Sequence, residues 1–389
     1  MIPYGRQYID NSDIKKIVSV LKSDWLTQGP LVPKFENTIK KFVGTKFAVS
    51  INSATSALHI SCLALGLKKG DYLWTVPNTF VASANCGLHC GAHIDFVDID
   101  NKTWNMSTEL LEKKLEYSKK KNKLPKIVVP VHFSGQSTDQ EKIWWLSKKY
   151  KFKIIEDASH SLGGLYKKQK IGSCKWSDVT IFSFHPVKPI TTGEGGMALT
   201  KNKNIYLKLL KYRNHGITNN YFELKKKINS HWYYEQQLLG FNYRMNDLEA
   251  SLGISQLKKL NYFVKKRNFI AKRYISKLKN LPIQLPYIEK FNYSTFHLFV
   301  IRFKSYLIKD FSYNNFFKKL RRNGIGVNLH YLPVHLHPYY KNLGFKKGDF
   351  PNSEKYSMEA MSLPIYHKLS MKNQEKTIKL IKKLVNANK

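Results

Sequence analysis

The chain has 389 residues, 42% of them hydrophobic, and carries 65 Lys and Arg against 27 Asp and Glu, a formal net charge of +38. This length and apolar content suffice for a large core and predict two domains. No run approaches the roughly 18 apolar residues of a membrane span, and the opening MIPYGRQYID lacks the apolar stretch of a signal peptide. We therefore expect a cytoplasmic protein with no membrane partner.

The high positive charge raises nucleic-acid binding as an alternative. Only eight of the 65 basic residues are Arg, whereas phosphate and base recognition leans on the bidentate Arg side chain. The Lys are scattered over helix faces that we expect to be exposed, which favours a solvated surface without a nucleic-acid partner. Salt-sensitive DNA binding would support the alternative.

The first two thirds of the chain alternate helices and strands. An amphipathic helix is predicted to follow Ser12 as its N-cap, and a buried helix after Ser53 is predicted to end at Gly66. Further helices are expected near Thr79 and over 139–150. The predicted strands are 47–51, 72–76, 93–100, 126–133, 153–157 and 179–184. This alternation predicts an α/β fold with a mostly parallel sheet covered on both faces.

The pattern changes beyond about Ala250. Long basic helices are predicted over 252–280, followed by a strand over 296–303, a helix that ends at Gly324 and a last helix over 373–388. We therefore expect a large α/β domain, residues 1–250, and a smaller C-terminal α+β domain, residues 251–389.

The four cysteines, at positions 62, 86, 90 and 174, do not form the pattern of a secreted disulfide framework, so a reducing compartment is expected. In CGLHCGAH, the spacing of Cys86, His89, Cys90 and His93 resembles that of zinc ligands. If the stretch is helical, four ligands from one helix cannot surround an ion tetrahedrally. Core or subunit-facing packing is therefore favoured, and no metal is expected.

Three groups of residues are predicted to meet where open parallel sheets bind ligands, at the carboxyl ends of the strands; the third group is the segment around Lys188. The small and hydroxyl residues Ser53, Ala54 and Thr55 begin a buried helix, whose free N–H groups can hold a phosphate; an ordinary cap is the alternative. Asp157 ends a strand inside the core and needs a cationic or N–H partner. Capping of the segment that follows is the alternative for Asp157.

Lys188, in SFHPVKPITTGEGGM, follows the strand over 179–184. Unlike the surface lysines it has stiff, apolar neighbours, and burial lowers the pKa of an amine until it becomes a nucleophile that can form a Schiff base. The glycines behind it allow the backbone to approach a ligand closely. A lysine, a carboxylate and a helix N-terminus together predict a pyridoxal phosphate (PLP) site.

The chain resembles the DegT/DnrJ/EryC1/StrS sugar aminotransferases, which have the aspartate aminotransferase-like fold (PLP-dependent transferase fold type I). The motifs EDASHSLGGLYKKQKIGS, SFHPVKPITTGEGGMALT, RNHGI and LGFNYRMNDLEASLGISQL carry this resemblance over nearly the whole chain. A dehydratase branch of the family replaces the lysine, so Lys188 favours transamination.

The resemblance implies the cofactor ligands residue by residue. Lys188 corresponds to the lysine that binds PLP covalently, Asp157 to the partner of the pyridine nitrogen, and His160 to the residue near the ring hydroxyl. The other implied ligands are Ala54, Thr55 and Ser183 at the phosphate, Phe80 stacked on the ring, and Asn242, which reaches the phosphate from the neighbouring subunit. The last role implies an obligate homodimer with composite active sites. His185 receives no role.

A narrower similarity, to the PseC branch, is carried by IPYGRQYIDNSDI, SDWLTQGP and GVNLHYLPVHLHPYYKNLGF. It implies transfer of an amino group from L-glutamate to C4 of a UDP-4-keto-6-deoxy-N-acetylhexosamine in pseudaminic acid biosynthesis (EC 2.6.1.92). The implied substrate contacts are Tyr4, Leu26, Thr27, His330 and Tyr331, with loop packing as the alternative for Tyr4, His330 and Tyr331. Two alternatives stay open: an aminotransferase for another nucleotide keto-sugar, of the legionaminic, bacillosamine or perosamine type, and a non-catalytic protein of this fold.

Overall fold

The computed structural model describes residues 1–386; residues 387–389, the end of the expected last helix and second domain, lie outside the described residues. The α-helices are α1 (Asn11–Leu21), α2 (Leu31–Val43), α3 (Ala54–Ala64), α4 (Ala82–Leu88), α5 (Thr108–Lys119), α6 (Gln140–Tyr150), α7 (Lys203–Arg213), α8 (Asp247–Leu257), α9 (Leu260–Leu278), α10 (Tyr313–Arg322), α11 (Pro338–Lys341), α12 (Pro351–Glu359) and α13 (Met371–Asn386). The strands are β1 (Phe47–Ile51), β2 (Tyr72–Thr75), β3 (His93–Phe96), β4 (Ile127–Val128), β5 (Lys153–Asp157), β6 (Leu165–Tyr166), β7 (Gln169–Lys170), β8 (Val179–Ser183), β9 (Gly196–Thr200), β10 (Ile217–Thr218), β11 (Glu235–Gln236), β12 (Ile283–Gln284), β13 (Asn292–Tyr293), β14 (Phe299–Phe303) and β15 (Ala360–Leu363). Short 3-10 helices are η1 (Phe133–Gly135), η2 (Tyr221–Glu223), η3 (Ser305–Leu307) and η4 (Val334–Leu336).

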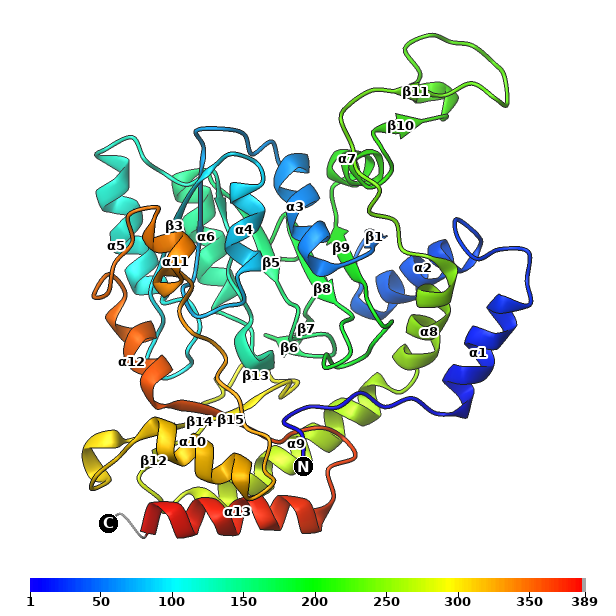
Figure 1. The fold of residues 1–389 in the computed structure, drawn as a ribbon. Helices are drawn as coiled ribbons and strands as arrows, with labels where there is room; N and C mark the ends of the chain where they lie inside the picture. The colour runs from blue at the N-terminus through cyan, green and yellow to red at the C-terminus, as the bar shows by residue number, and fades with distance from the viewer. Residues whose placement is uncertain (387–389) are drawn as a thin grey trace.

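A seven-stranded sheet lies at the centre of the molecule, in the order β1-β9-β8-β5-β4-β2-β3 (Figure 1). Strand β9 runs antiparallel to its neighbours β1 and β8. The remaining neighbours, from β8 across to β3, pair in parallel. The prediction of an α/β fold with a mostly parallel sheet is therefore confirmed.

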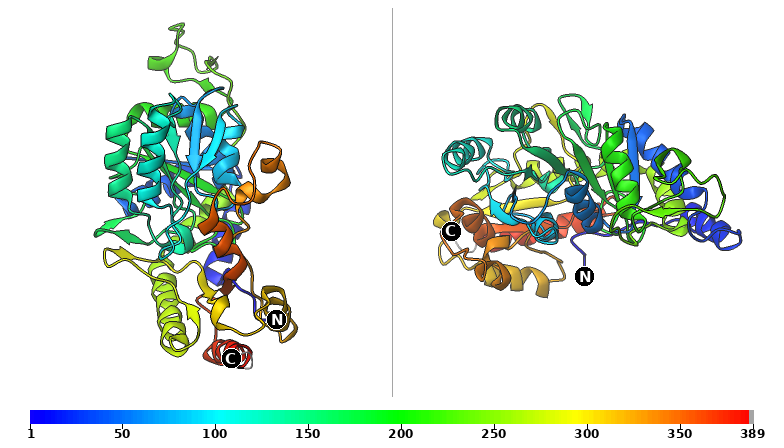
Figure 2. Two further views of the ribbon diagram at one scale, coloured as in Figure 1. Left: turned by 90° about the vertical axis from the view of Figure 1, so that its left-hand side faces the viewer. Right: turned by 90° about the horizontal axis from the view of Figure 1, so that it is seen from above.

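Side chains that alternate along the strands determine which helices cover each face of the sheet. Leu73 and Ile155 are buried on one face, in a cluster with residues of α3, α4 and α7. Trp74 and Ile154 are buried on the other face with residues of α5 and α6. Farther along that second face, α2 and α8 pack on β8 and β9. Figure 2 shows the sheet between these two layers of helices.

A second, three-stranded antiparallel sheet, β12-β14-β15, packs against α9, α10 and α13. Helix α9 is shared, because Phe263 is buried with the large sheet's helices whereas Tyr274 is buried with the small sheet. The start of the chain also packs here: Ile2 pairs with Ile325, and the Tyr4 carbonyl accepts a hydrogen bond from the Ile365 N–H. The domain division at 250/251 stays a prediction.

The predicted N-cap of the first helix was wrong. The N-cap of α1 is Asp10, whose side chain accepts from the Ser12 and Asp13 N–H groups in a capping box, because a carboxylate two residues earlier competes successfully with the Ser12 hydroxyl. In CGLHCGAH, Cys86 lies in α4, which ends at Leu88, and His93 begins β3, at the first residue of the strand predicted over 93–100.

The described part of the chain holds no group of three or more His, Cys, Asp or Glu arranged to bind a metal. The same residues contain no helix long and apolar enough to cross a membrane.

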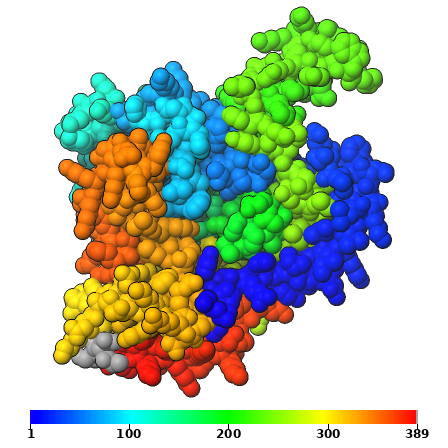
Figure 3. All heavy atoms as spheres, in the orientation of Figure 1, coloured from blue at the N-terminus to red at the C-terminus, as the bar shows by residue number. Residues whose placement is uncertain are grey.

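A hairpin made of β10 and β11 and the loop between them stands away from the body of the protein (Figures 1 and 3). We call this segment, residues 217–236, the arm. Its large side chains are exposed: Phe222 is 86% and Trp232 76% accessible. Figure 3 also shows the segment around residues 185–195, green at the centre, at the surface beside the N-terminal segment.

Asp98 joins the large sheet's side of the molecule to α12. Its buried carboxylate accepts hydrogen bonds from the Asn352 and Ser353 N–H groups and from the Ser353 hydroxyl. These N–H groups belong to the first turn of α12, whose N-cap, Phe350, supplies no side-chain cap. Since Tyr356 of α12 donates to the His330 carbonyl, Asp98 supports the segment that carries His330 and Tyr331.

We expect Asp98→Ala to lower the free energy of unfolding by about 2–3 kcal/mol, because it leaves the helix N–H groups buried without an acceptor. Urea unfolding followed by circular dichroism measures this. Glu116→Ala, on the exposed face of α5, is the control and should change stability by less than about 0.5 kcal/mol. Equal effects of the two substitutions would show that the Asp98 cap is not important for stability.

Candidate active site

A cavity of about 500 Å³ opens at the carboxyl ends of the parallel strands. It brings together residues that are far apart in the sequence. The lining residues named in the sequence analysis are Tyr4, Ser53, Ala54, Thr55, Phe80, Asp157, His160, Ser183, His185, Lys188, His330 and Tyr331. The sheet topology explains why these residues lie together. Strands β1, β5 and β8 all end at the edge of the sheet where the cavity opens, and lining residues follow each of them.

Asp157 is a buried carboxylate, 6% exposed, at the end of β5. One oxygen accepts from the Ser83 hydroxyl at 2.6 Å, and the other accepts from the N–H and hydroxyl of Ser159 at 3.1 and 2.6 Å. Among residues 1–386, no Lys, Arg or His nitrogen forms an ion pair with it. A buried charge without a basic partner fits a cation supplied by a ligand.

Lys188 lies in the turn after β8, where its N–H donates to the His185 carbonyl. Its side chain lines the same cavity as Asp157. Burial lowers the pKa of the Lys188 amine to about 8, although the charge of Asp157 acts in the opposite direction. With this pKa, roughly a tenth of the amine is uncharged at pH 7, and the uncharged form is the one that acts as a nucleophile or a base.

The start of α3 lines the cavity next to Asp157 and Lys188. Ser53 is the N-cap, and its hydroxyl accepts from the Ser56 N–H. Ala54, Thr55 and Ser183 line the cavity. The N–H groups of Ala54 and Thr55 precede the first intrahelical bond, which the Ala57 N–H donates to the Ser53 carbonyl. A Cβ on Gly196 would lie 2.4 Å from the Ala54 nitrogen, so only glycine lets β9 pass this close to the helix start. Such an N-terminus, next to a hydroxyl, suits a phosphate.

His160 and Tyr331 also line the cavity, and both side chains are uncharged. His160 Nδ1 lies 3.2 Å from the Ser134 nitrogen, and its Nε2 lies 3.3 Å from the Tyr331 hydroxyl oxygen. His297 packs on the His160 ring with centroids 4.3 Å apart. Burial lowers the pKa of both imidazoles well below the ordinary value. His330 is buried beside Tyr4 and bonds to the Ser362 hydroxyl, and burial lowers its pKa to about 3.

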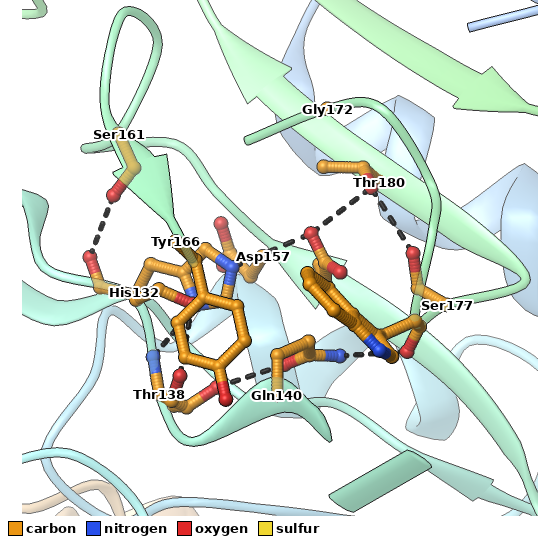
Figure 4. A network of polar contacts seen from close by, with 12 residues as sticks. His132, Thr138, Gln140, Asp157, Ser161, Tyr166, Gly172, Ser177 and Thr180 are labelled. Atoms are coloured by element: carbon orange, nitrogen blue, oxygen red, sulfur yellow. Dashed lines mark hydrogen bonds and ion pairs between the residues drawn. The ribbon is translucent and has the colours of Figure 1, made fainter. Parts of the chain in front are cut away.

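A buried polar network around His132 and Thr180 supports β5 (Figure 4). The Glu156 carboxylate accepts from the Thr180 hydroxyl at 3.1 Å and lies 3.4 Å from His132 Nε2. The His132 carbonyl accepts from the Ser161 hydroxyl. Because consecutive strand residues point to opposite faces, Glu156 anchors the strand while Asp157 faces the cavity.

Three predicted site residues lie elsewhere. Leu26 and Thr27 belong to the loop between α1 and α2, and Asn242 pairs with Asn214 at the base of the arm. A second hollow, of about 590 Å³, lies in this region. Its lining includes Gln28, Arg213, Asn214 and Arg244, the immediate neighbours of the three residues in sequence or space.

Other lining residues were missed by the sequence analysis: Ser83, Ser159, Glu194, His297 and Asn328. Ser159 had a detectable signal, since Asp-x-Ser favours a turn in which the carboxylate accepts from the residue two positions on. Ser83 and His297 had none, because tertiary packing alone brings them to the site.

The cavity fits PLP. Asp157 lacks a basic partner and matches a protonated pyridine nitrogen, the start of α3 with Ser183 matches a phosphate, and Lys188 matches an aldehyde. Phe80, 59% exposed, lies at the cavity wall 6.4 Å from the Tyr331 ring. The role of each residue stays a prediction.

The chain is similar to known proteins in both sequence and structure. The family model described as the DegT/DnrJ/EryC1/StrS aminotransferase family matches residues 7–382. A Campylobacter jejuni protein named UDP-4-amino-4,6-dideoxy-N-acetyl-beta-L-altrosamine transaminase is 38% identical over 96% of this chain and 94% of its own length. The structure of Helicobacter pylori PseC, an aminotransferase of pseudaminic acid biosynthesis, is 30% identical, with a TM-score of 0.89 over 99% of both chains. The PLP form of the sugar aminotransferase Spr1654 from Streptococcus pneumoniae, described as putative, is 28% identical, with a TM-score of 0.88 over 100% of this chain and 99% of its own.

The lowered pKa of Lys188 predicts an unusual pH dependence of its reactivity. In cofactor-free protein, reductive methylation of Lys188 by formaldehyde should rise with pH around a midpoint near 8, because only the uncharged amine reacts. The exposed Lys102 is the reference lysine. Peptide mass spectrometry across a pH series measures both. A Lys188 curve that coincides with that of Lys102 would contradict the lowered pKa.

Proposed function

The chain belongs to the DegT/DnrJ/EryC1/StrS aminotransferase family, and on that premise we propose that it moves an amino group from L-glutamate to C4 of a UDP-4-keto-6-deoxy-N-acetylhexosamine. The product is UDP-4-amino-4,6-dideoxy-N-acetyl-β-L-altrosamine (EC 2.6.1.92), in pseudaminic acid biosynthesis. Enzymes of the family depend on PLP. The observation that carries the amino transfer is that Lys188 and the unpaired Asp157 line one cavity. The named Campylobacter relative supports this sugar.

In this proposal, different residues of the chain hold the cofactor, transfer the proton and contact the sugar. When bound, PLP supplies a carbonyl that takes up the amino group and a ring that withdraws electrons from the reacting carbon. Asp157 keeps a proton on the ring nitrogen, and the α3 start with Ser183 holds the phosphate. Lys188 Nζ takes the proton from Cα of glutamate and, in the second half of the cycle, gives one to C4 of the sugar. Tyr4, His330 and Tyr331 contact the sugar.

The active unit in this proposal is a homodimer with composite sites. Asn242 of the partner subunit reaches the phosphate, which agrees with the position of Asn242 outside the cavity of its own chain. Leu26 and Thr27 lie in the loop that runs into the hollow near Asn242. The exposed aromatic side chains of the arm are apolar surface that a second copy would bury. Four free cysteines favour a cytoplasmic location.

The substrate assignment predicts a defined product. With L-glutamate and PLP, the wild-type protein should convert the UDP-4-keto-sugar to the 4-amino sugar, identified by NMR. Lys188→Ala should lower turnover by about a thousandfold or more, because no other base replaces Nζ, while Lys102→Ala should keep it. Faster amination of another UDP- or GDP-keto-sugar would contradict the proposed substrate, and full turnover by Lys188→Ala would contradict the mechanism.

The composite site predicts complementation between two defective subunits. Lys188→Ala lacks the base, and Asn242→Asp places a negative charge against the phosphate, so each homodimer should be nearly inactive. Co-expression with two different tags isolates the mixed dimer, which contains one intact site and should recover about half of the wild-type rate. Without recovery, Asn242 does not act across the interface; a monomer in light scattering would contradict the dimer itself.

A further inference from the structure

The hydrogen bonds that join Ser134, His160 and Tyr331 have a direction that their atoms determine. The Ser134 N–H lies against His160 Nδ1 at 3.2 Å. A backbone N–H can only donate, so Nδ1 must present its lone pair. The other ring nitrogen, Nε2, lies 3.3 Å from the Tyr331 hydroxyl oxygen.

His160 is a neutral imidazole. Burial lowers its pKa well below the ordinary value, and the nearby Lys188, His330 and His132 act in the same direction. A neutral imidazole carries one N–H, which must be on Nε2 because Nδ1 accepts. The Nε2–H therefore donates to the Tyr331 oxygen.

The hydroxyl proton of Tyr331 is therefore free to be donated to another group. Its hydroxyl accepts from His160 and forms no other hydrogen bond to any residue between 1 and 386. Burial raises the pKa of this hydroxyl, with Asp157 and Tyr4 acting in the same direction, so it keeps its proton. Tyr331 lines the cavity together with Lys188.

We propose that Tyr331 is a hydrogen-bond donor of fixed direction inside the catalytic cavity, and that His160 is the positioning residue that sets this direction through the tautomer that Ser134 imposes. The group that receives this hydrogen bond must present a lone pair, which a deprotonated or carbonyl oxygen does without acting as a donor itself. Two candidates share this chemistry: the ring oxygen of the cofactor and the carbonyl oxygen of the keto-sugar. The amino product lacks that oxygen, so a fixed donor would discriminate substrate from product. The second candidate rests on the proposed function; the tautomer does not.

The tautomer can be observed directly. In full-length protein labelled with ¹⁵N-histidine, with and without PLP, the His160 signal should show an unprotonated Nδ1 and a protonated Nε2 at neutral pH. Loss of the signal in His160→Gln assigns it. A proton on Nδ1, or an imidazolium, would overturn the proposal, whatever sugar the enzyme accepts.

Tyr331→Phe tests the donor and identifies its acceptor. A fall of about tenfold in PLP affinity would support the proposal with the cofactor oxygen as acceptor. A similar fall in the rate of the keto-sugar half-reaction, with PLP affinity and the glutamate half-reaction unchanged, would support it with the sugar oxygen. Changes of less than twofold in all three would overturn it. Tyr306→Phe, on the exposed η3, is the matched control.

Variants of His160 test the positioning role. In His160→Gln, the side-chain oxygen can accept from Ser134 while the amide nitrogen donates to Tyr331, so the function should be retained within about threefold. His160→Leu should lose as much as Tyr331→Phe, and combining the two changes should add little. Equal loss in the Gln and Leu variants would show that the direction of the bond is not what matters, and would overturn the positioning role.

Discussion

The cavity is organised around one buried carboxylate that forms no ion pair with a basic side chain of the described residues. Asp157 is held by hydroxyl and N–H groups of Ser83 and Ser159, which stabilise a negative charge without neutralising it. The charge therefore remains available to a cationic ligand atom, and it opposes the effect of burial on the Lys188 amine. The fold supports this arrangement with the Glu156 network that supports β5 (Figure 4).

The positions of the other residues that line the cavity are determined by where the strands end. The start of α3, which suits a phosphate, follows β1, and Lys188 follows β8. Because these strands run parallel to β5, both lie at the edge of the sheet where β5 ends with Asp157. The small sheet contributes from the other side. Its neighbouring segment carries His330 and Tyr331, which Tyr356 and the Asp98 cap of α12 hold in place. Substrate contacts from this side would thus depend on how the two sheets pack together.

The elements that carry the chemistry were predictable because each has a local signature. Lys188 stands between prolines, Asp157 ends an apolar strand, and the helix after Ser53 begins with small polar residues. The limits of the prediction are physical too. His297 and Ser83 reach the cavity only through tertiary packing. Leu26, Thr27 and Asn242 lie outside the cavity of their own chain, so their roles stay predictions. Ser12 failed as an N-cap because a carboxylate was in reach.

The central claim is that Lys188 is the amine to which the cofactor binds. Borohydride reduction of the PLP-loaded protein traps a cofactor bound to an amine, and peptide mass spectrometry then locates it. We expect one modified residue, Lys188, in the peptide that contains SFHPVKPITTGEGGM. A cofactor trapped on another lysine, or no site-specific modification among so many lysines, would contradict the account.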